Sequence, residues 1–154
     1  MDFTVRQIEA LPRPLAGIAE CVAPTALSAA ISTLLGEVWQ HLNGGNILTT
    51  GHNVILYNGQ ANPDFDALFG VEVHEKYAQA GRIIAAETPG GPVAMAVYWG
   101  QYTGLPEAHA TVRQWLDAQG LQRAGPSWEI YHDWNDDPKK LRTDIFYLLE
   151  PATQ

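Results

Sequence analysis

The strongest constraint on the fold is that the first half of the sequence recurs in the second half, in the same order. Residues 9–16 match 87–94 at an offset of 78, 38–43 match 112–117 at 74, Gly51 and Tyr57 match Gly125 and Tyr131 at 74, and 71–73 match 143–145 at 72. Because the matches are collinear, they indicate an internal duplication. We expect a single domain over residues 1–154 that contains two repeats, about 1–77 and 78–150.

Both repeats show the same succession of extended and helical patterns. Extended runs that end at prolines, 3–9 and 82–88, are followed by second runs at 15–21 and 93–99. Pairs of strands then close the repeats, 53–57 with 70–74 in the first and 127–133 with 142–149 in the second. With one helix between the second and third strands, the order β-β-α-β-β is predicted twice.

The helices are recognised by apolar residues that recur with a period near 3.6 over 27–42 and 105–116. Thr25 and Thr103 are the expected N-caps, because a threonine hydroxyl can accept a hydrogen bond from the first helical turn. Glycines at 44–45 and 120 are expected to end the helices.

These elements predict an α+β fold of tandem duplicated ββαββ units, each with one helix on an antiparallel sheet. Two such units side by side leave a ligand groove at their pseudo-twofold boundary, where concave sites commonly form. The alternative is a duplicated scaffold whose boundary is filled with side chains.

The composition favours a cytoplasmic globular protein. Hydrophobic residues make up 46% of the chain, no apolar run approaches the roughly 20 residues needed to span a bilayer, and the start lacks a secretory-signal pattern. Cys21 is the single cysteine and cannot form an internal disulfide, which suits a reducing compartment.

The net charge of −8 argues against direct binding of nucleic acid, and it suits a cationic ligand or a basic protein partner. The oligomeric state is left open.

Glu129 is the residue that most strongly indicates function. Strand alternation places Glu129 and Tyr131 on one face of the sheet, and Trp128 and Ile130 on the other. A carboxylate among aromatic side chains is costly to desolvate unless a cation meets it. Its counterpart in the first repeat is Ile55, so only one repeat carries the acid. The alternative is a glutamate on the solvent face of the sheet.

Aromatic side chains are plentiful, with five Trp and six Tyr, and ring faces can attract a cationic ligand. Trp115 and Trp128 are expected in the core. The expected ligand-binding residues, in addition to Glu129, are Trp39, Tyr57, Trp99, Tyr102 and Tyr131. No cofactor and no metal site is expected, because the five histidines lack paired ligand spacing and nucleotide-binding fingerprints are missing.

Five motifs together suggest a family. They are Pro89-Gly90-Gly91-Pro92-Val93-Ala94, Gly100-x-Tyr102-x-x-Leu105, Trp115-Leu116-x-x-x-Gly120, Trp128-Glu129-Ile130-Tyr131 and Leu141-Arg142-Thr143-Asp144-Ile145. In this order and spacing the chain resembles, from Phe3 to Glu150, the effector-binding domain of gyrase-inhibitory (GyrI-like) proteins. The same domain forms the ligand-sensing half of several bacterial transcription activators, AraC-type regulators among them.

The resemblance implies a duplicated α+β fold with a multidrug-binding groove for lipophilic, often cationic compounds. It also implies that Glu129 lies at the groove floor between aromatic walls. Here Trp99-Gly100-Gln101-Tyr102 stands where the family often has His-x-Gly-Pro-Tyr, so one end of the groove is expected to be narrower. No DNA-binding segment is recognised, so a stand-alone form is expected.

The leading functional hypothesis is a non-enzymatic domain that senses or sequesters an amphipathic, cationic organic molecule. One alternative is a hydrolase of cyclopropane-bearing alkylating compounds, a reaction that some members of the family carry out. Glu129 would then be the general base, beside Tyr102 or Trp99. Another alternative is a protein-binding regulator whose acidic surface docks on a basic partner such as a topoisomerase.

Overall fold

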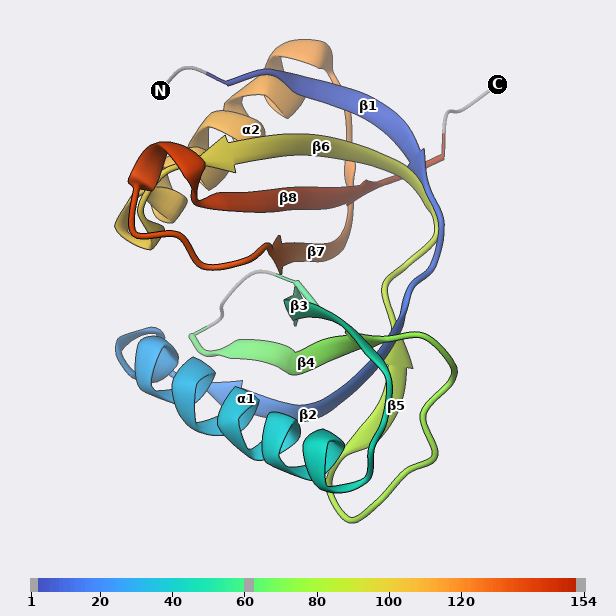
Figure 1. Ribbon diagram of the computed structural model, residues 1–154. Coiled ribbons are helices and arrows are strands. Elements are labelled where there is room, and N and C mark those ends of the chain that lie inside the picture. The colour runs from blue at the N-terminus through green and yellow to red at the C-terminus, as the bar shows by residue number, and fades with distance from the viewer. Residues whose placement is uncertain (1–2, 60–62, 152–154) are drawn as a thin grey trace.

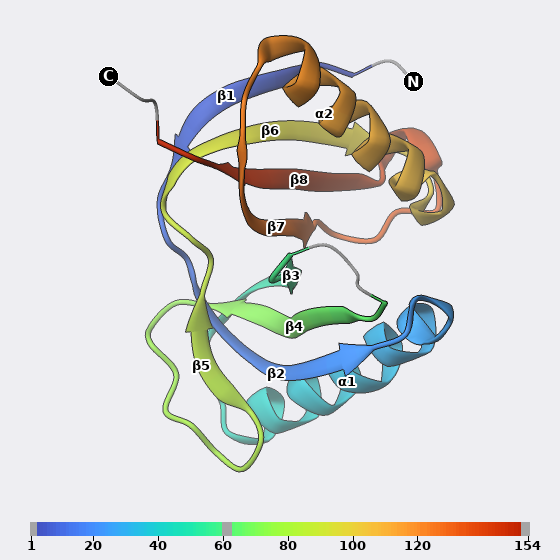
Figure 2. The ribbon, with the colours of Figure 1, turned by 180° about the vertical axis from the view of Figure 1, so that it is seen from behind.

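The computed structural model describes residues 3–59 and 63–151, in which eight strands form one antiparallel sheet accompanied by two helices (Figures 1 and 2). The strands are β1 (Val5–Ala10), β2 (Pro14–Val22), β3 (Thr49–Tyr57), β4 (Phe65–Val73), β5 (Ile84–Glu87), β6 (Gly91–Trp99), β7 (Arg123–Tyr131) and β8 (Arg142–Leu149). The helices are α1 (Leu27–Gly44) and α2 (Leu105–Gln119). Across the sheet the order is β1-β6-β8-β7-β3-β4-β2-β5, and the predicted α+β class is confirmed.

The two repeats exchange their first strands. β1 pairs with β6 of the second repeat, and β5 pairs with β2 of the first. In Figure 1 the chain runs from β1 in the upper half of the sheet into β2 in the lower half, and from β5 below into β6 above. This exchange differs from two self-contained sheets. The prolines at 12 and 14 explain it, because they favour extended backbone at Leu11 and Arg13, so the chain continues across the boundary.

The strand register reproduces the duplication. Glu9 lies opposite Pro92, and Glu87 lies opposite Pro14. The two pairs are equivalent, because Glu87 is the counterpart of Glu9 and Pro92 is the counterpart of Pro14 at the offset of 78. The offset of 72 between 71–73 and 143–145 is wrong. Ala16 pairs with residue 71 of β4, and its counterpart Ala94 pairs with residue 147 of β8. Positions in β4 therefore correspond to positions in β8 at an offset of 76. The limits of the repeats, 1–77 and 78–150, stay predictions.

The pseudo-twofold axis passes between Ile55 and Glu129. β3 and β7 are the central pair of the sheet, with Asn53 opposite Tyr131 and Ile55 opposite Glu129. Along this pairing, Ile55 and Glu129 are the residues whose partner across the ladder is also their counterpart at the offset of 74. The carboxylate singled out from the sequence therefore lies where the two halves meet.

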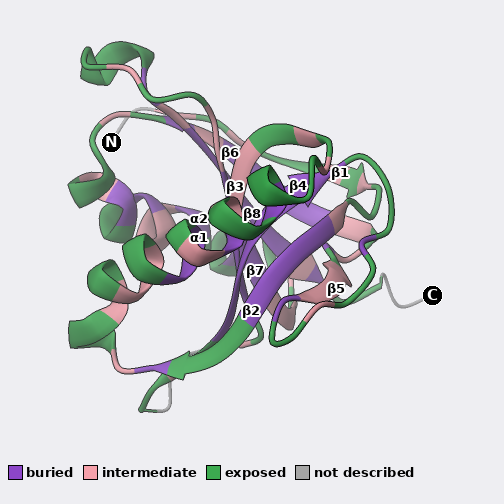
Figure 3. Ribbon diagram, turned by 60° about the horizontal axis from the view of Figure 1, so that its bottom comes forward, coloured by how far each residue is buried: buried purple, intermediate pink, exposed green. Residues whose placement is uncertain are grey.

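Both helices pack on the same face of the sheet. Ile55, Glu129 and Ile145 are paired across β3, β7 and β8, so their side chains share a face. Ile55 belongs to the core under α1, and Ile145 belongs to the core under α2. Figure 3 shows the buried residues along the strands and on the inner sides of the helices, whose outer sides are exposed.

The helix ends differ in part from prediction. Each helix is entered through a short 3-10 turn, so Ala26 and Gly104 occupy the N-cap positions. In the described part of the chain no side chain caps either helix by a hydrogen bond. The predicted caps at Thr25 and Thr103 are therefore wrong, because both residues lie inside those turns. The C-terminal glycines are confirmed, and Gly120 has a positive φ of 69°.

The face of the sheet away from the helices forms a separate hydrophobic core. Trp128 is 1% exposed, and its ring stacks on Phe146 at a centroid distance of 5.2 Å. Ile8 of β1 and Ile84 of β5, which are the two edge strands, pack against this same core. The sheet is therefore strongly coiled, and the core around Trp128 supports the strand that carries Glu129.

Candidate functional site

A groove of about 1120 Å³ lies between the two helices and over the central β3–β7 pair. Tyr57 on β3 and Glu129 and Tyr131 on β7 line its floor. The residues that the helices contribute to its walls include Leu27, Ile31 and Leu35 of α1, and Leu105, His109 and Arg113 of α2. The predicted groove at the repeat boundary is therefore present, and the alternative of a filled boundary is wrong.

The two helical walls of the groove differ in chemistry. Leu105, His109 and Arg113 are spaced by four residues, so they form one row along α2. At the offset of 74, Ile31 and Leu35 of α1 are the counterparts of Leu105 and His109. The α1 wall thus consists of leucine, isoleucine and serine side chains, whereas the α2 wall also carries the titratable His109 and the charged Arg113.

Glu129 is 3% exposed and is held by hydrogen bonds from three side chains. The hydroxyls of Tyr131 and Tyr57 donate to its Oε1 atom at 2.7 and 3.2 Å. His109 Nε2 lies 2.8 Å from Oε2 and donates to it, since a carboxylate can only accept. Both carboxylate oxygens therefore have partners, which is what a buried acid requires.

His109 connects this floor to a further tyrosine. Its Nδ1 atom lies 2.6 Å from the Tyr147 hydroxyl, and Tyr147 is 2% exposed. The imidazole thus bridges Glu129 and Tyr147, and the polar groups of the second repeat form one connected network.

Burial is the main cause that raises the pKa of the groove phenols Tyr57, Tyr131 and Tyr147 above the usual 10.0. For Tyr57 and Tyr131 the negative charge of Glu129 is the next cause, because it disfavours a second negative charge nearby. All three hydroxyls therefore stay protonated, and for Tyr57 and Tyr131 this is what hydrogen-bond donation to Glu129 requires.

We expect stability to fall steeply above about pH 10. The unfolded chain then loses phenol protons that the folded state keeps, so each of the three tyrosines subtracts up to about 1.4 kcal/mol per pH unit from the free energy of unfolding. Below about pH 10 the three phenols are protonated in the folded and the unfolded state, so they do not make the free energy of unfolding depend on pH. Denaturant titrations at increasing pH measure the slope, and Tyr57→Phe should reduce it. Simultaneous ionisation of all tyrosines in the folded protein, followed by phenolate absorbance, would contradict this expectation.

Four of the six predicted ligand-binding residues line the groove: Tyr57, Tyr102, Glu129 and Tyr131. Trp39 and Trp99 do not. Trp39 packs against the core under α1, and its Nε1 donates to Asn53 Oδ1 at 2.7 Å. Trp99 is 53% exposed, with the Arg142 guanidinium 5.9 Å from its ring centroid. The role of the four lining residues in binding stays a prediction.

The sequence interpretation missed several groove residues. His109 and Arg113 could have been found from their spacing to Leu105, which places all three on one side of α2. Trp134 also lines the groove, and its ring lies 5.8 Å from that of Tyr102. It follows β7 in an irregular segment, where no periodicity marks a side chain for the groove.

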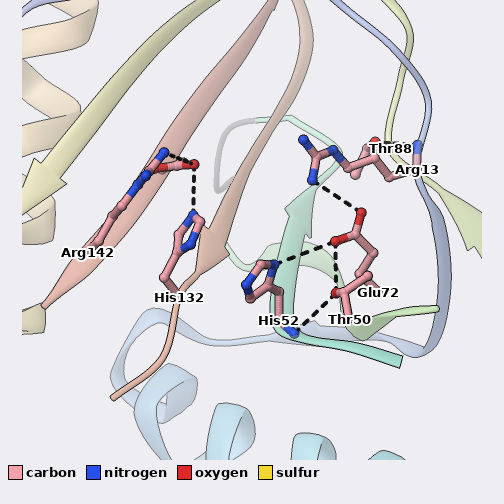
Figure 4. Close-up of polar contacts among 8 residues, drawn as sticks. Arg13, Thr50, His52, Glu72, Thr88, His132 and Arg142 are labelled. Atoms are coloured by element: carbon pink, nitrogen blue, oxygen red, sulfur yellow. Dashed lines mark hydrogen bonds and ion pairs between the residues drawn. The ribbon is translucent and has the colours of Figure 1, made fainter. Parts of the chain in front are cut away.

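A second polar cluster lies beside the central strand pair (Figure 4). Glu72 and Asp144, each 6% exposed, are its buried carboxylates. The rings of His52 and His132 lie 4.6 Å apart between them. The remaining members are Arg13, Thr50, Thr88 and Arg142. The described residues contain no group of three or more His, Cys, Asp or Glu side chains that could hold a metal ion. The cluster consists of one set of polar contacts around Glu72 and another around Asp144, which meet where the rings of His52 and His132 are in contact.

Within the described residues, neither helix combines the length and hydropathy needed to cross a membrane.

Comparison with known proteins gives a family and a fold. The sequence model of the family described as "GyrI-like small molecule binding domain" matches residues 1–149. A search of curated proteins gave no match. Among solved structures, the EcmrR C-terminal domain has a TM-score of 0.80 at 19% identity, covering 99% of this chain and 100% of that one.

Two further structures share the fold. EcmrR in complex with DNA has a TM-score of 0.81 at 18% identity over 97% of this chain, which spans 58% of that longer chain. SAV2435 bound to tetraphenylphosphonium has a TM-score of 0.67 at 14% identity, covering 97% of this chain and 94% of that one.

Proposed function

Because the chain belongs to the family of GyrI-like small molecule binding domains, we propose that it senses or sequesters an amphipathic organic molecule in the groove between α1 and α2. The observation that carries the proposal is the groove itself, which combines a mainly apolar wall, aromatic side chains and a buried polar floor. Small-molecule sites typically have this combination of broad apolar surface and a few convergent polar groups.

The aromatic side chains that line the groove suit a ligand with aromatic rings. Tyr102 packs edge to face against Tyr131, with ring centroids 5.4 Å apart, and Trp134 continues this aromatic side of the groove. Trp134 is 67% exposed, so a bound ligand can bury apolar surface that is now in contact with water. Ring contacts and this burial would supply most of the affinity.

We further propose that Glu129 favours ligands with positive charge. The fold is shared with SAV2435, whose structure holds the lipophilic cation tetraphenylphosphonium. In this chain the Glu129 carboxylate lies under the groove with Tyr57 and Tyr131 beside it. Through a partly desolvated floor, its charge would act on a ligand cation without direct contact.

Glu129→Gln is expected to weaken tetraphenylphosphonium binding by about tenfold or more, which corresponds to about 1.4 kcal/mol. Triphenylphosphine oxide, a neutral compound that keeps three of the four phenyl rings, should bind equally well to the native protein and to Glu129→Gln. Titration followed by tryptophan fluorescence measures both, because Trp134 stands in the groove.

The matched control for this experiment is Glu107→Gln, which removes the same charge from the exposed surface of α2. It should leave both affinities unchanged. Equal losses for the cation and the neutral compound in Glu129→Gln would remove charge selection from the proposal, whereas no binding of either compound to the native protein would count against the site as a whole.

Hydrolysis with Glu129 as general base stays a prediction from the sequence. Both oxygens of Glu129 are engaged by Tyr57, Tyr131 and His109, and Trp99 lies outside the groove, so no observation favours this alternative. A protein partner and a cytoplasmic location also stay proposals. The location is supported by Cys21, which is a free, exposed thiol.

A further inference from the structure

Two arginines of the groove converge on Tyr147. Arg113 NH1 donates to the Tyr147 hydroxyl at 3.2 Å. The guanidinium of Arg123 lies over the ring of the same tyrosine, with its central carbon 4.7 Å from the centroid. Both arginines line the groove. The backbone permits this arrangement because the β7–β8 register shifts between Arg123 and Ser127, where Gly125 has a φ of 118°.

Neither arginine has an acidic partner among the described residues. The guanidinium groups of Arg13, Arg82 and Arg142 each lie within 4.0 Å of a carboxylate, whereas Arg113, Arg123 and the exposed Arg6 form no such pair in residues 3–59 and 63–151. Of the three arginines without a carboxylate partner in these residues, Arg113 and Arg123 line the groove.

Arg123 also carries a buried donor that lacks an acceptor. Its Nε atom is shielded from solvent and has no hydrogen-bond partner among the residues that the structure describes. Leaving a charged donor unsatisfied costs more than leaving a neutral one, and a planar oxyanion would remove that cost. Glu129 does not supply it, because its two oxygens are engaged by Tyr57, Tyr131 and His109.

We infer that Arg113 and Arg123, which meet at the Tyr147 side chain, form a subsite for an acidic group of the ligand, such as a carboxylate or sulfonate. The inference rests on the proposed function, because the subsite is one end of the same groove. His109 lies between Tyr147, where the arginines meet, and Glu129. A ligand can therefore place an anionic group at the arginines and a cationic or neutral body over Glu129. The preferred ligand is then a zwitterion with an apolar body, whose acidic group lies at the two arginines and whose positive charge lies over Glu129.

The test compares two fluorescent probes that differ only in one acidic group, anilinonaphthalenesulfonate and N-phenylnaphthylamine. The native protein should bind the sulfonate at least about tenfold more tightly, as expected for hydrogen bonds to a charged group. In Arg113→Gln/Arg123→Gln that advantage should disappear, while the affinity for the neutral probe stays within about twofold of the native value. Retained binding of the neutral probe shows that the groove is folded.

Lys139→Gln/Lys140→Gln is the matched control, because it removes the same total charge from exposed positions outside the groove. It should preserve the preference for the sulfonate. Equal affinity of the native protein for both probes, or an unchanged preference in the double arginine variant, would overturn the subsite and leave the proposed groove intact. Failure of both probes, and of tetraphenylphosphonium, to bind at all would instead overturn the proposed function.

Discussion

Trp128→Ala is expected to lower the free energy of unfolding by about 3–5 kcal/mol, the range for removal of a large aromatic side chain from a core. Trp128 is 1% exposed and stacks on Phe146. It lies on the face of β7 opposite to Glu129, so its loss should also loosen the strand that positions the groove floor. For a domain whose total stability is typically about 5–15 kcal/mol, this is a large fraction.

Urea unfolding followed by far-ultraviolet circular dichroism measures the effect of Trp128→Ala. Trp134→Ala is the matched control, since Trp134 is 67% exposed and its removal should change stability by less than about 0.5 kcal/mol. A loss in Trp128→Ala as small as that expected for Trp134→Ala would show that the core on this face of the sheet contributes little to stability.

His109→Leu is expected to destabilise the protein by about 3 kcal/mol near neutral pH. The substitution removes one partner from a buried carboxylate, and Glu129 would keep only the hydroxyls of Tyr57 and Tyr131. Leucine is the residue found at the corresponding position of α1, Leu35, so it suits a wall of this groove. The loss should therefore come from the charge and not from steric conflict.

A double-mutant cycle isolates that contribution. If the penalty of His109→Leu arises from an unpaired carboxylate, then adding Glu129→Gln should recover at least about 1 kcal/mol, because a neutral amide is cheaper to bury. Additive losses in the double variant would mean that His109 acts through packing alone. His74→Leu, at an exposed position, controls for the loss of a histidine as such.

The sequence predicted those parts of the fold that depend on local patterns. Alternation along β7 correctly separated Glu129 and Tyr131, which line the groove, from Trp128 and Ile130, which are buried on the other face. The apolar stripes located both helices, and the duplication indicated a groove between two related halves. The alternation and the stripes are encoded within a few neighbouring residues, and the duplication is visible because two distant segments repeat the same local pattern.

The features that escaped prediction depend on contacts between distant segments. The exchange of β1 and β5 does not alter the pattern of either strand, so periodicity cannot reveal it. His109 was overlooked because its partners, Glu129 and Tyr147, lie 20 and 38 positions away. Trp99 was expected in the groove from its position beside α2, but the end of β6 directs it toward Arg142 and solvent.

The position of Glu129 on the axis has a consequence for how such a groove can arise. In a homodimer of one repeat, a residue on the axis faces its own copy, so a glutamate there would meet a second glutamate. Like charges directly opposite each other in an antiparallel pair are destabilising, and two buried carboxylates so close cannot both stay ionised. Fusion into one polypeptide removes this restriction, because each copy can change alone. Ile55 then occupies one side of the axis, and a solitary acid becomes possible on the other.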